Sequence, residues 1–249
     1  DRLENVDVVN GQLRLMALSE NYTAANFPPE FNETPVTYVT QDYTSGKVRT
    51  RELADWKYGR FSARMKLPEG QGTWPAFWMM PTEDYYGLWP LSGEIDIMEH
   101  INTSDKIHGT IHWDNNGYAT YGGDETIFNV SDFHTYAIEW DASGIRWFVD
   151  GNQYHSANTL NNINSTAEFQ ESFFFILNMA VGGNWPENVN NTGIDASAFE
   201  NGQTFEIDYV RVYQCIQNPD TGKGCETVRG GYDSLDDALL EGAAPIPSP

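Results

Sequence analysis

The chain has 249 residues, of which 40% are hydrophobic and 14% aromatic, enough for a sizeable core. Its 36 acidic and 14 basic residues give a formal net charge of −22, which argues against nucleic acid and against sulfated or carboxylated polymers as partners. A neutral polymer fits this charge, and no run of apolar residues is long enough for a membrane-spanning helix.

Apolar and polar residues alternate along most of the chain, which predicts β-strands. The first follows an Asn10-Gly11 turn, and further strands are predicted at residues 60–67, 133–140 and 206–213. At residues 145–155 the pattern predicts a hairpin that turns at Asp150-Gly151.

Residues 173–181 (FFFILNMAV) are nearly all apolar, which predicts a central strand buried on both faces. Helical periodicity is convincing only near residues 233–242. We therefore expect an all-β domain over residues 1–214, a sandwich or jelly roll of two antiparallel sheets.

Residues 215–249 are rich in Gly, Pro and Asp, which predicts a C-terminal tail or linker. The two cysteines, Cys215 and Cys225, predict one disulfide that closes a short loop. No further Cys or nearby His completes a zinc site.

The stretch GEIDIMEH, residues 93–100, combines a strand pattern with three carboxylates. Apolar residues alternate with Glu94 and Asp96, so these two acids share one face of the strand. Glu99 lies at an odd offset and would point to the other face. A β-bulge with Met98 as the extra residue would reset the alternation and align all three acids.

Clustered carboxylates raise one another's pKa, so one can stay protonated near neutral pH while another is ionised. Sugar hydrolysis uses such a pair. A bulge would bring the Glu94 and Glu99 carboxyls to about 5 to 6 Å, close to the separation of about 5 to 5.5 Å in retaining glycosidases. An inverting separation of about 6.5 to 9.5 Å stays open, as does a merely solvated acidic strand.

Three tryptophans accompany the acids. Trp74 and Trp78 lie four residues apart in the segment 70–81, so strand spacing puts both on one face, and Trp185 follows in GGNWP. A single tryptophan belongs more often to a core than to a binding platform. Several beside an acid cluster favour a carbohydrate cleft, because aromatic faces stack on sugar rings.

GEIDIMEH resembles the signature of glycoside hydrolase family 16, in which three acids alternate with hydrophobic residues. The segments YGRFSARMKLPEGQGTWPAFWMMP, FHTYAIEWD, IRWFVDG, FFFILNMAVGGNWP and IDYVRVY resemble its laminarinase branch, the endo-1,3-β-glucanases. The resemblance runs from residue 1 to about 213. It implies a concanavalin A-like jelly roll with a concave glycan cleft, and hydrolysis with retention.

Carried over to this chain, the resemblance implies that Glu94 is the nucleophile, Asp96 its assisting acid and Glu99 the general acid/base. It implies that Trp74, Trp78 and Trp185 stack on sugars. Three further residues are implied to bind substrate: Asn178, a cleft-facing His112 beside the acid/base, and Arg64 on the polar face of its strand. Structural roles for these three stay open, and Trp113 is expected in the core.

Many family members carry a structural calcium ion, which here would be held by Gly11 and Asp208, and hard oxygen ligands suit calcium. In the family a further strand usually precedes DRLENV, and we expect this domain to depart from that pattern by lacking it, which argues against the metal. No cofactor is expected for catalysis.

We expect a secreted, monomeric enzyme that cleaves neutral 1,3-β-glucan or mixed 1,3/1,4-β-glucan. The alternatives are an agarase or transglycosylase on the same fold, and a glycan-binding module without catalysis. A degenerate binder would be expected to lose at least one of the three acids, and all three are present.

Overall fold

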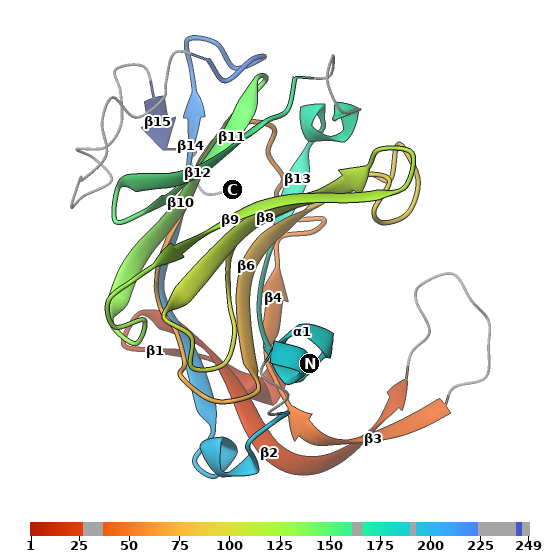
Figure 1. Cartoon of the computed structure of the whole chain (residues 1–249), viewed down its shortest axis with the longest axis vertical. Coiled ribbons are helices and arrows are strands. Elements are labelled where there is room, and N and C mark those ends of the chain that lie inside the picture. The colour runs from red at the N-terminus through yellow and green to blue at the C-terminus, as the bar shows by residue number, and fades with distance from the viewer. Residues whose placement is uncertain (27–36, 161–165, 190–192, 224–242, 246–249) are drawn as a thin grey trace.

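The computed structural model describes residues 1–26, 37–160, 166–189, 193–223 and 243–245. Within these residues the chain folds into two antiparallel β-sheets that pack against each other (Figure 1). The larger sheet has nine strands in this part of the chain: β1 (Val6–Val9), β2 (Gln12–Asn26), β3 (Thr37–Thr44), β5 (Gly59–Lys66), β10 (Phe133–Asp141), β11 (Gly144–Val149), β12 (Asn152–Asn158), β14 (Gln203–Cys215) and β15 (Ala243–Pro245).

The smaller sheet is curved and carries the candidate site (Figure 1). Its six described strands have the order β4-β13-β6-β7-β8-β9. Their bounds are β4 (Lys47–Arg49), β6 (Thr73–Pro81), β7 (Glu94–His100), β8 (Lys106–Asp114), β9 (Tyr118–Thr126) and β13 (Phe173–Val181).

Helices are few and short in the described residues: the α-helix α1 (Asn184–Asn188) and the 3-10 helices η1 (Leu3–Asn5), η2 (Ala167–Gln170) and η4 (Ala196–Phe199). None of these helices is long and apolar enough to cross a membrane. The all-β class and the two antiparallel sheets predicted from the sequence are confirmed.

The core lies between the two sheets and is built by strand alternation. On β13, Phe173, Phe175, Leu177 and Met179 point into the core, whereas Asn178 lines a cavity on the opposite face. Both faces of the strand are largely buried over residues 173–177. The prediction of a strand buried on both sides is therefore confirmed for residues 173–177, whereas Asn178 and Ala180 line the cavity.

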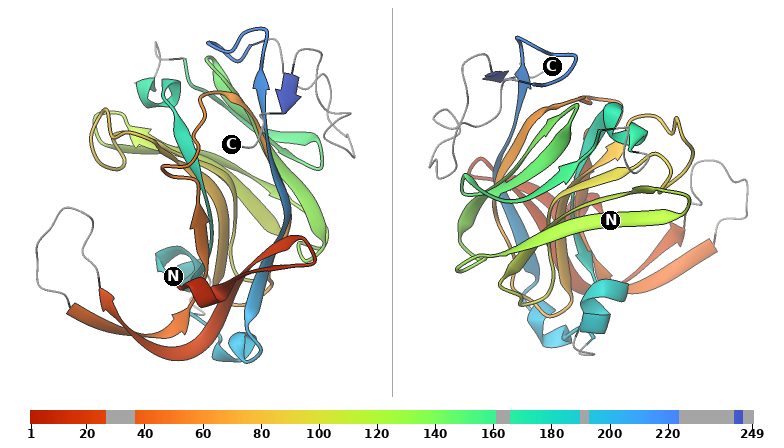
Figure 2. Two further views of the ribbon diagram at one scale, coloured as in Figure 1. Left: turned by 180° about the vertical axis from the view of Figure 1, so that it is seen from behind. Right: turned by 45° about the horizontal axis from the view of Figure 1, so that its top comes forward.

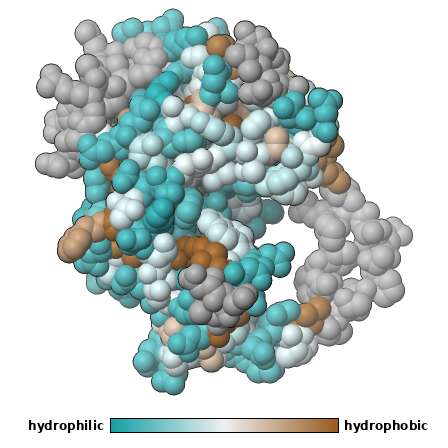
Figure 3. All heavy atoms as spheres, in the orientation of Figure 1, coloured by the Kyte–Doolittle hydropathy of each residue, from teal (hydrophilic) through white to brown (hydrophobic). Residues whose placement is uncertain are grey.

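Local turn chemistry also follows the sequence. Asp150 and Gly151 join β11 to β12, both with positive φ (48° and 75°), as a tight hairpin turn requires. A longer hairpin, β2–β3, projects from the body (Figure 2). The face drawn in Figure 3 is largely hydrophilic, in keeping with the acidic composition.

The C-terminal segment is described in part. Cys215 ends β14 and is disulfide-bonded, whereas its predicted partner Cys225 and the helical pattern at residues 233–242 lie outside the described residues. Strand β15 pairs with β14 at Tyr213–Pro245. The boundary at residue 214 stays a prediction.

Candidate active site

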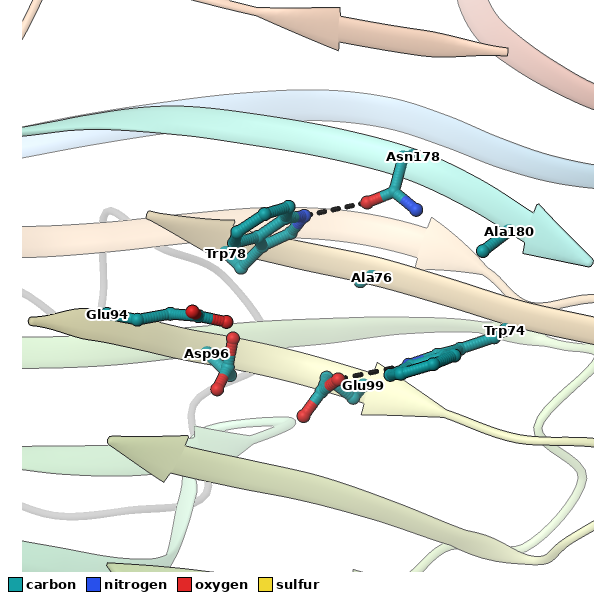
Figure 4. A pocket seen from close by; sticks show the side chains of 8 residues that line it. All are labelled: Trp74, Ala76, Trp78, Glu94, Asp96, Glu99, Asn178 and Ala180. Atoms are coloured by element: carbon teal, nitrogen blue, oxygen red, sulfur yellow. Dashed lines mark hydrogen bonds between the residues drawn. The ribbon is translucent and has the colours of Figure 1, made fainter. Parts of the chain in front are cut away.

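Strand β7 contains the predicted irregularity. Asp96 lies opposite Thr110 of β8 and Glu99 opposite His108, so three steps on β7 match two on β8. The extra residue resets the alternation, and Glu99 points to the same face as Asp96 (Figure 4).

The bulge differs in one detail from the prediction. On the β6 side Asp96 pairs with Trp78 and Met98 with Phe77, so the residue without a counterpart is Ile97, not Met98. Both Ile97 and Met98 are buried in the core. Burying two successive apolar side chains is what turns Glu99 back to the cleft.

The opposite sheet supports the bulge from below. The indole Nε1 of Trp147, on β11, donates a hydrogen bond of 2.8 Å to the backbone carbonyl of Asp96. A Cβ at Gly109 would lie 2.3 Å from Trp147 Cδ1, so only glycine leaves room for this ring. Trp147 therefore gives a backbone carbonyl at the buried bulge a hydrogen-bond donor.

The three acids line one cavity of about 220 Å³ on the curved sheet (Figure 4). The cavity crosses three adjacent strands, β7, β6 and β13. Its lining residues are Trp74, Ala76, Trp78, Glu94, Asp96, Glu99, Asn178 and Ala180.

The environment of Glu99 favours its protonated form up to near neutral pH. Burial raises the pKa of Glu99 to about 7. The indole Nε1 of Trp74 donates a 3.0 Å hydrogen bond to Glu99 Oε1 and lowers the pKa, while the charge of Glu94 raises it. A carboxyl with this pKa can act as a general acid and, once ionised, as a general base.

Two hydrogen-bond donors stabilise the ionised form of Glu94. Burial raises the pKa of Glu94, and hydrogen bonds from Asp96 and from the Trp89 indole partly offset that rise. Asp96 is 2% exposed, and its pKa lies well above the ordinary value because of burial and the charges of Glu99 and Glu94. A protonated Asp96 can therefore donate to an ionised Glu94.

His112 belongs to the acid cluster. It lies opposite Glu94 on β8, its Nε2 is 3.0 Å from Asp96 Oδ2, and its Nδ1 is 2.8 Å from the Tyr118 hydroxyl. The expected place beside Glu99 is wrong, because register puts His108 there. Burial lowers the pKa of His112, so its neutral form is favoured.

Two of the three predicted tryptophans, Trp74 and Trp78, line the acid cavity, whereas Trp185 lies outside it. Trp78 Nε1 donates a 2.7 Å hydrogen bond to Asn178 Oδ1, which fixes the indole and satisfies the amide oxygen (Figure 4). Trp185, on α1, contacts Trp74 edge to face with ring centres 5.6 Å apart. Trp113 is buried in the core as expected.

One group in the described part of the chain has three ligand atoms close enough for a metal ion. It consists of Glu94, Asp96 and His112, whose ligand atoms lie within 4.8 Å of one another. Within this group Asp96 is hydrogen-bonded to Glu94, and His112 Nε2 lies 3.0 Å from Asp96 Oδ2. An ion there would compete with that arrangement.

Comparison with known proteins decides the family. The protein-family model described as "Glycosyl hydrolases family 16" matches residues 8–211 of the chain. The chain belongs to this family. It is a glycoside hydrolase, and the resemblance inferred from GEIDIMEH and its flanking segments is confirmed.

Relatives of this family 16 hydrolase include proteins that are 38% identical to it over the aligned residues. It is 38% identical over 228 residues to the β-glucanase of Rhodothermus marinus, covering 87% of this chain and 72% of that protein. It is 38% identical over 215 residues to the clotting factor G α subunit of Tachypleus tridentatus, covering 86% of this chain but 29% of that protein. The laminarinase structure from Rhodothermus marinus aligns with a TM-score of 0.71 at 38% identity, covering 85% of this chain and 80% of that one.

Arg64 does not line the acid cavity of the family 16 hydrolase, so the prediction that it binds substrate there is wrong. It lies on β5 in the larger sheet, where Nη1 is 2.7 Å from Asp208 Oδ2 and the guanidinium lies over the Phe133 ring at 4.5 Å. Arg64 is a partly exposed residue of the larger sheet, with a side chain 39% exposed, and it does not line the cavity of the acids.

The sequence pattern missed Trp89 of this hydrolase. Trp89 is 51% exposed in the loop between β6 and β7, yet its indole bonds to Glu94. Loop residues have no periodicity from which a direction can be read. The signal available in the sequence was a tryptophan five residues before Glu94.

We expect Trp89→Phe in the hydrolase to move the acidic limb of the pH profile to higher pH. Losing the indole donor disfavours the ionised form of Glu94 and raises its pKa. The measurement is kcat/KM against pH, with Tyr85→Phe as control because Tyr85 is a 69% exposed ring in the same loop. An unchanged acidic limb in Trp89→Phe would show that this bond does not tune Glu94.

Proposed function

We propose that the enzyme is a retaining endo-glycoside hydrolase that cleaves internal bonds of β-1,3-glucan, or of mixed 1,3/1,4-β-glucan, by double displacement. Ionised Glu94 attacks the anomeric carbon while Glu99 protonates the glycosidic oxygen. Glu99 then takes a proton from the water that attacks the glycosyl-enzyme, and the sugar leaves with its configuration retained. Asp96 holds Glu94 by a hydrogen bond throughout.

The pairing of Glu94 and Glu99 on one bulged strand carries this proposal. One carboxyl accepts donors that favour its charge, and the other keeps a proton to a pKa of about 7. Two carboxylates with separated pKa values are what double displacement requires. The expected separation of about 5 to 6 Å between the two carboxyls stays a prediction.

The substrate class rests on the cavity and on the named relatives. Trp74 and Trp78 flank the acids, and aromatic faces suit sugar rings. A relative named β-glucanase and a structure named laminarinase are both 38% identical to this chain over the aligned residues. The net charge of −22 favours a neutral polymer over an anionic one.

Product analysis on laminarin, mixed-linkage glucan and agarose side by side tests the substrate. We expect short oligosaccharides from laminarin, or from laminarin and mixed-linkage glucan. Oligosaccharides from agarose alone would overturn the substrate, and binding without any cleavage would favour the glycan-binding module. Longer products made from short oligosaccharides would favour a transglycosylase.

We expect a bell-shaped dependence of kcat/KM on pH. The pKa of Glu99 is about 7, so the protonated acid is lost as the pH rises through that value and the rate falls. On the acid side the rate falls as Glu94 takes up a proton, at a pH above its ordinary range because its pKa is raised. A rate that stays constant well above pH 8 would contradict Glu99 as the acid.

The structural calcium implied by the resemblance stays a prediction, and the residues present fit it poorly. Gly11, in the β1–β2 turn, would offer a carbonyl, but Asp208 already faces the Arg64 guanidinium. In the described residues no group of three His, Cys or acidic ligands includes Asp208, and calcium takes about six to eight oxygens. We therefore expect EDTA to leave the melting temperature unchanged; a clear drop that calcium reverses would restore the site.

We also propose that the protein is secreted and monomeric. The disulfide at Cys215 is typical of proteins that fold in oxidising compartments. Fractionation of the source cells and sedimentation of the purified chain test the two statements.

A further inference from the structure

A second cavity lies beside the acid cluster, past Glu99. Its volume is about 340 Å³, against about 220 Å³ for the cavity that holds the acids, and it falls in the range of about 300–1,000 Å³ typical of ligand sites. The residues that line it include Gln71, Asn102, Thr103, Lys106, His108 and Trp185.

This side pocket does not continue the line of the cleft. The acid cavity runs across the strands β7, β6 and β13, and its continuation would cross the middle of β8 near Thr110 and His112. The side pocket instead lies at the start of β8 and in the loop that follows β7, beside α1. His108, directly opposite Glu99, marks where the two meet.

Hydrogen bonds hold the walls of the side pocket in place. Asn102 accepts a 2.8 Å bond from the Gly72 backbone N–H and donates a 3.0 Å bond to the Pro186 carbonyl, so it ties the loop after β7 to α1. Gln71 Nε2 donates a 2.8 Å bond to the Gly193 carbonyl. Walls fixed in this way do not need to be ordered by the ligand, which favours binding.

The lining suits a neutral, hydroxyl-rich ligand. Lys106 Nζ lies 2.8 Å and 3.2 Å from the two Asp124 carboxylate oxygens, which balances its charge. Burial lowers the pKa of His108, so its neutral ring can both donate and accept hydrogen bonds. Trp185 adds an aromatic ring, in edge contact with His108 at 4.9 Å.

We propose that the side pocket binds a neutral glycosyl branch carried by the glucan main chain next to the bond that is cleaved. A branch fits because the pocket is polar, charge-balanced and aromatic, and because two of its lining residues adjoin the acid cavity: His108 lies opposite Glu99, and Trp185 contacts Trp74. The inference rests on the proposed function, since it takes the main chain to run across the strands over the acids.

Filling the pocket tests the inference. Thr103 lines it and is exposed, so Thr103→Trp adds bulk without touching the core. Asp105→Trp is the matched control, because Asp105 is exposed in the same loop but does not line the pocket. The substrates are a linear β-1,3-gluco-oligosaccharide and the same backbone with a single β-1,6-glucosyl branch, and the readout is kcat/KM.

We expect Thr103→Trp to lower kcat/KM on the branched substrate by about tenfold, the worth of one or two hydrogen bonds, and to leave the linear substrate unchanged. Asp105→Trp should change neither. Equal losses on both substrates, or no loss on either, would overturn the branch pocket. Should wild type cleave neither substrate, the proposed function fails, and calorimetric binding of the branched oligosaccharide to the same variants then decides the pocket by itself.

Discussion

Replacing Glu94 by glutamine is expected to lower kcat by about 10⁴-fold or more while the protein stays folded, as when a nucleophile is removed from other enzymes. Glutamine keeps the shape and an oxygen that can accept the Trp89 indole bond, but it cannot attack as a carboxylate. The measurement is steady-state hydrolysis of laminarin together with the melting temperature. Retention of more than a tenth of the activity would remove Glu94 from the mechanism.

Two comparisons make this result specific. Glu99→Gln should lower the rate by about 10²–10⁴-fold and should also abolish the basic limb of the pH profile, because the group with the pKa of about 7 is gone. Glu168→Gln should leave the activity intact. Glu168 is likewise buried with a raised pKa, but it lies outside the acid cavity.

Replacing Trp147 by phenylalanine is expected to lower kcat by about 10–100-fold, although Trp147 lies beneath the sheet and does not line the acid cavity. Without the indole N–H, the Asp96 carbonyl at the bulge loses its 2.8 Å partner. The bulge then relaxes, and a shift of Glu99 relative to Glu94 by even about 1 Å is costly for a reaction that needs both carboxyls in place. The free energy of unfolding should fall by about 1–3 kcal/mol.

The matched control is Trp140→Phe. Trp140 is as deeply buried as Trp147, and its indole also donates to a backbone carbonyl, that of Phe169, at 3.2 Å. Both variants should lose similar stability, measured by urea unfolding. Only Trp147→Phe should lose catalysis, and equal kcat values for the two variants would show that the indole bond does not hold the acids in register.

The sequence predicted the acid strand well because its information is local. Alternation within residues 93–100 shows that Glu99 is out of phase, and only a bulge corrects the phase without moving the other two acids. The structure confirms the irregular ladder. The identity of the unpaired residue, Ile97 and not Met98, depends on pairing with β6, which the local pattern does not contain.

The supports of the site were not predictable from local patterns. Trp147 and Gly109 meet under the bulge from β11 and β8, and their contact exists only once the two sheets pack. The wrong prediction for Arg64 has a different cause. Alternation correctly puts it on the polar face of β5, but it does not tell which of the two sheets the strand joins.

The most direct test of the central claim, that the bulge makes Glu94 a nucleophile beside a protonated Glu99, is covalent trapping. An activated 2-deoxy-2-fluoro-β-laminaribioside should form a slowly hydrolysed glycosyl-enzyme, which peptide mass spectrometry locates. The label is expected on Glu94 alone, in the peptide that contains GEIDIMEH. A label on Glu99, or release of the α-anomer as first product without any label, would contradict the account.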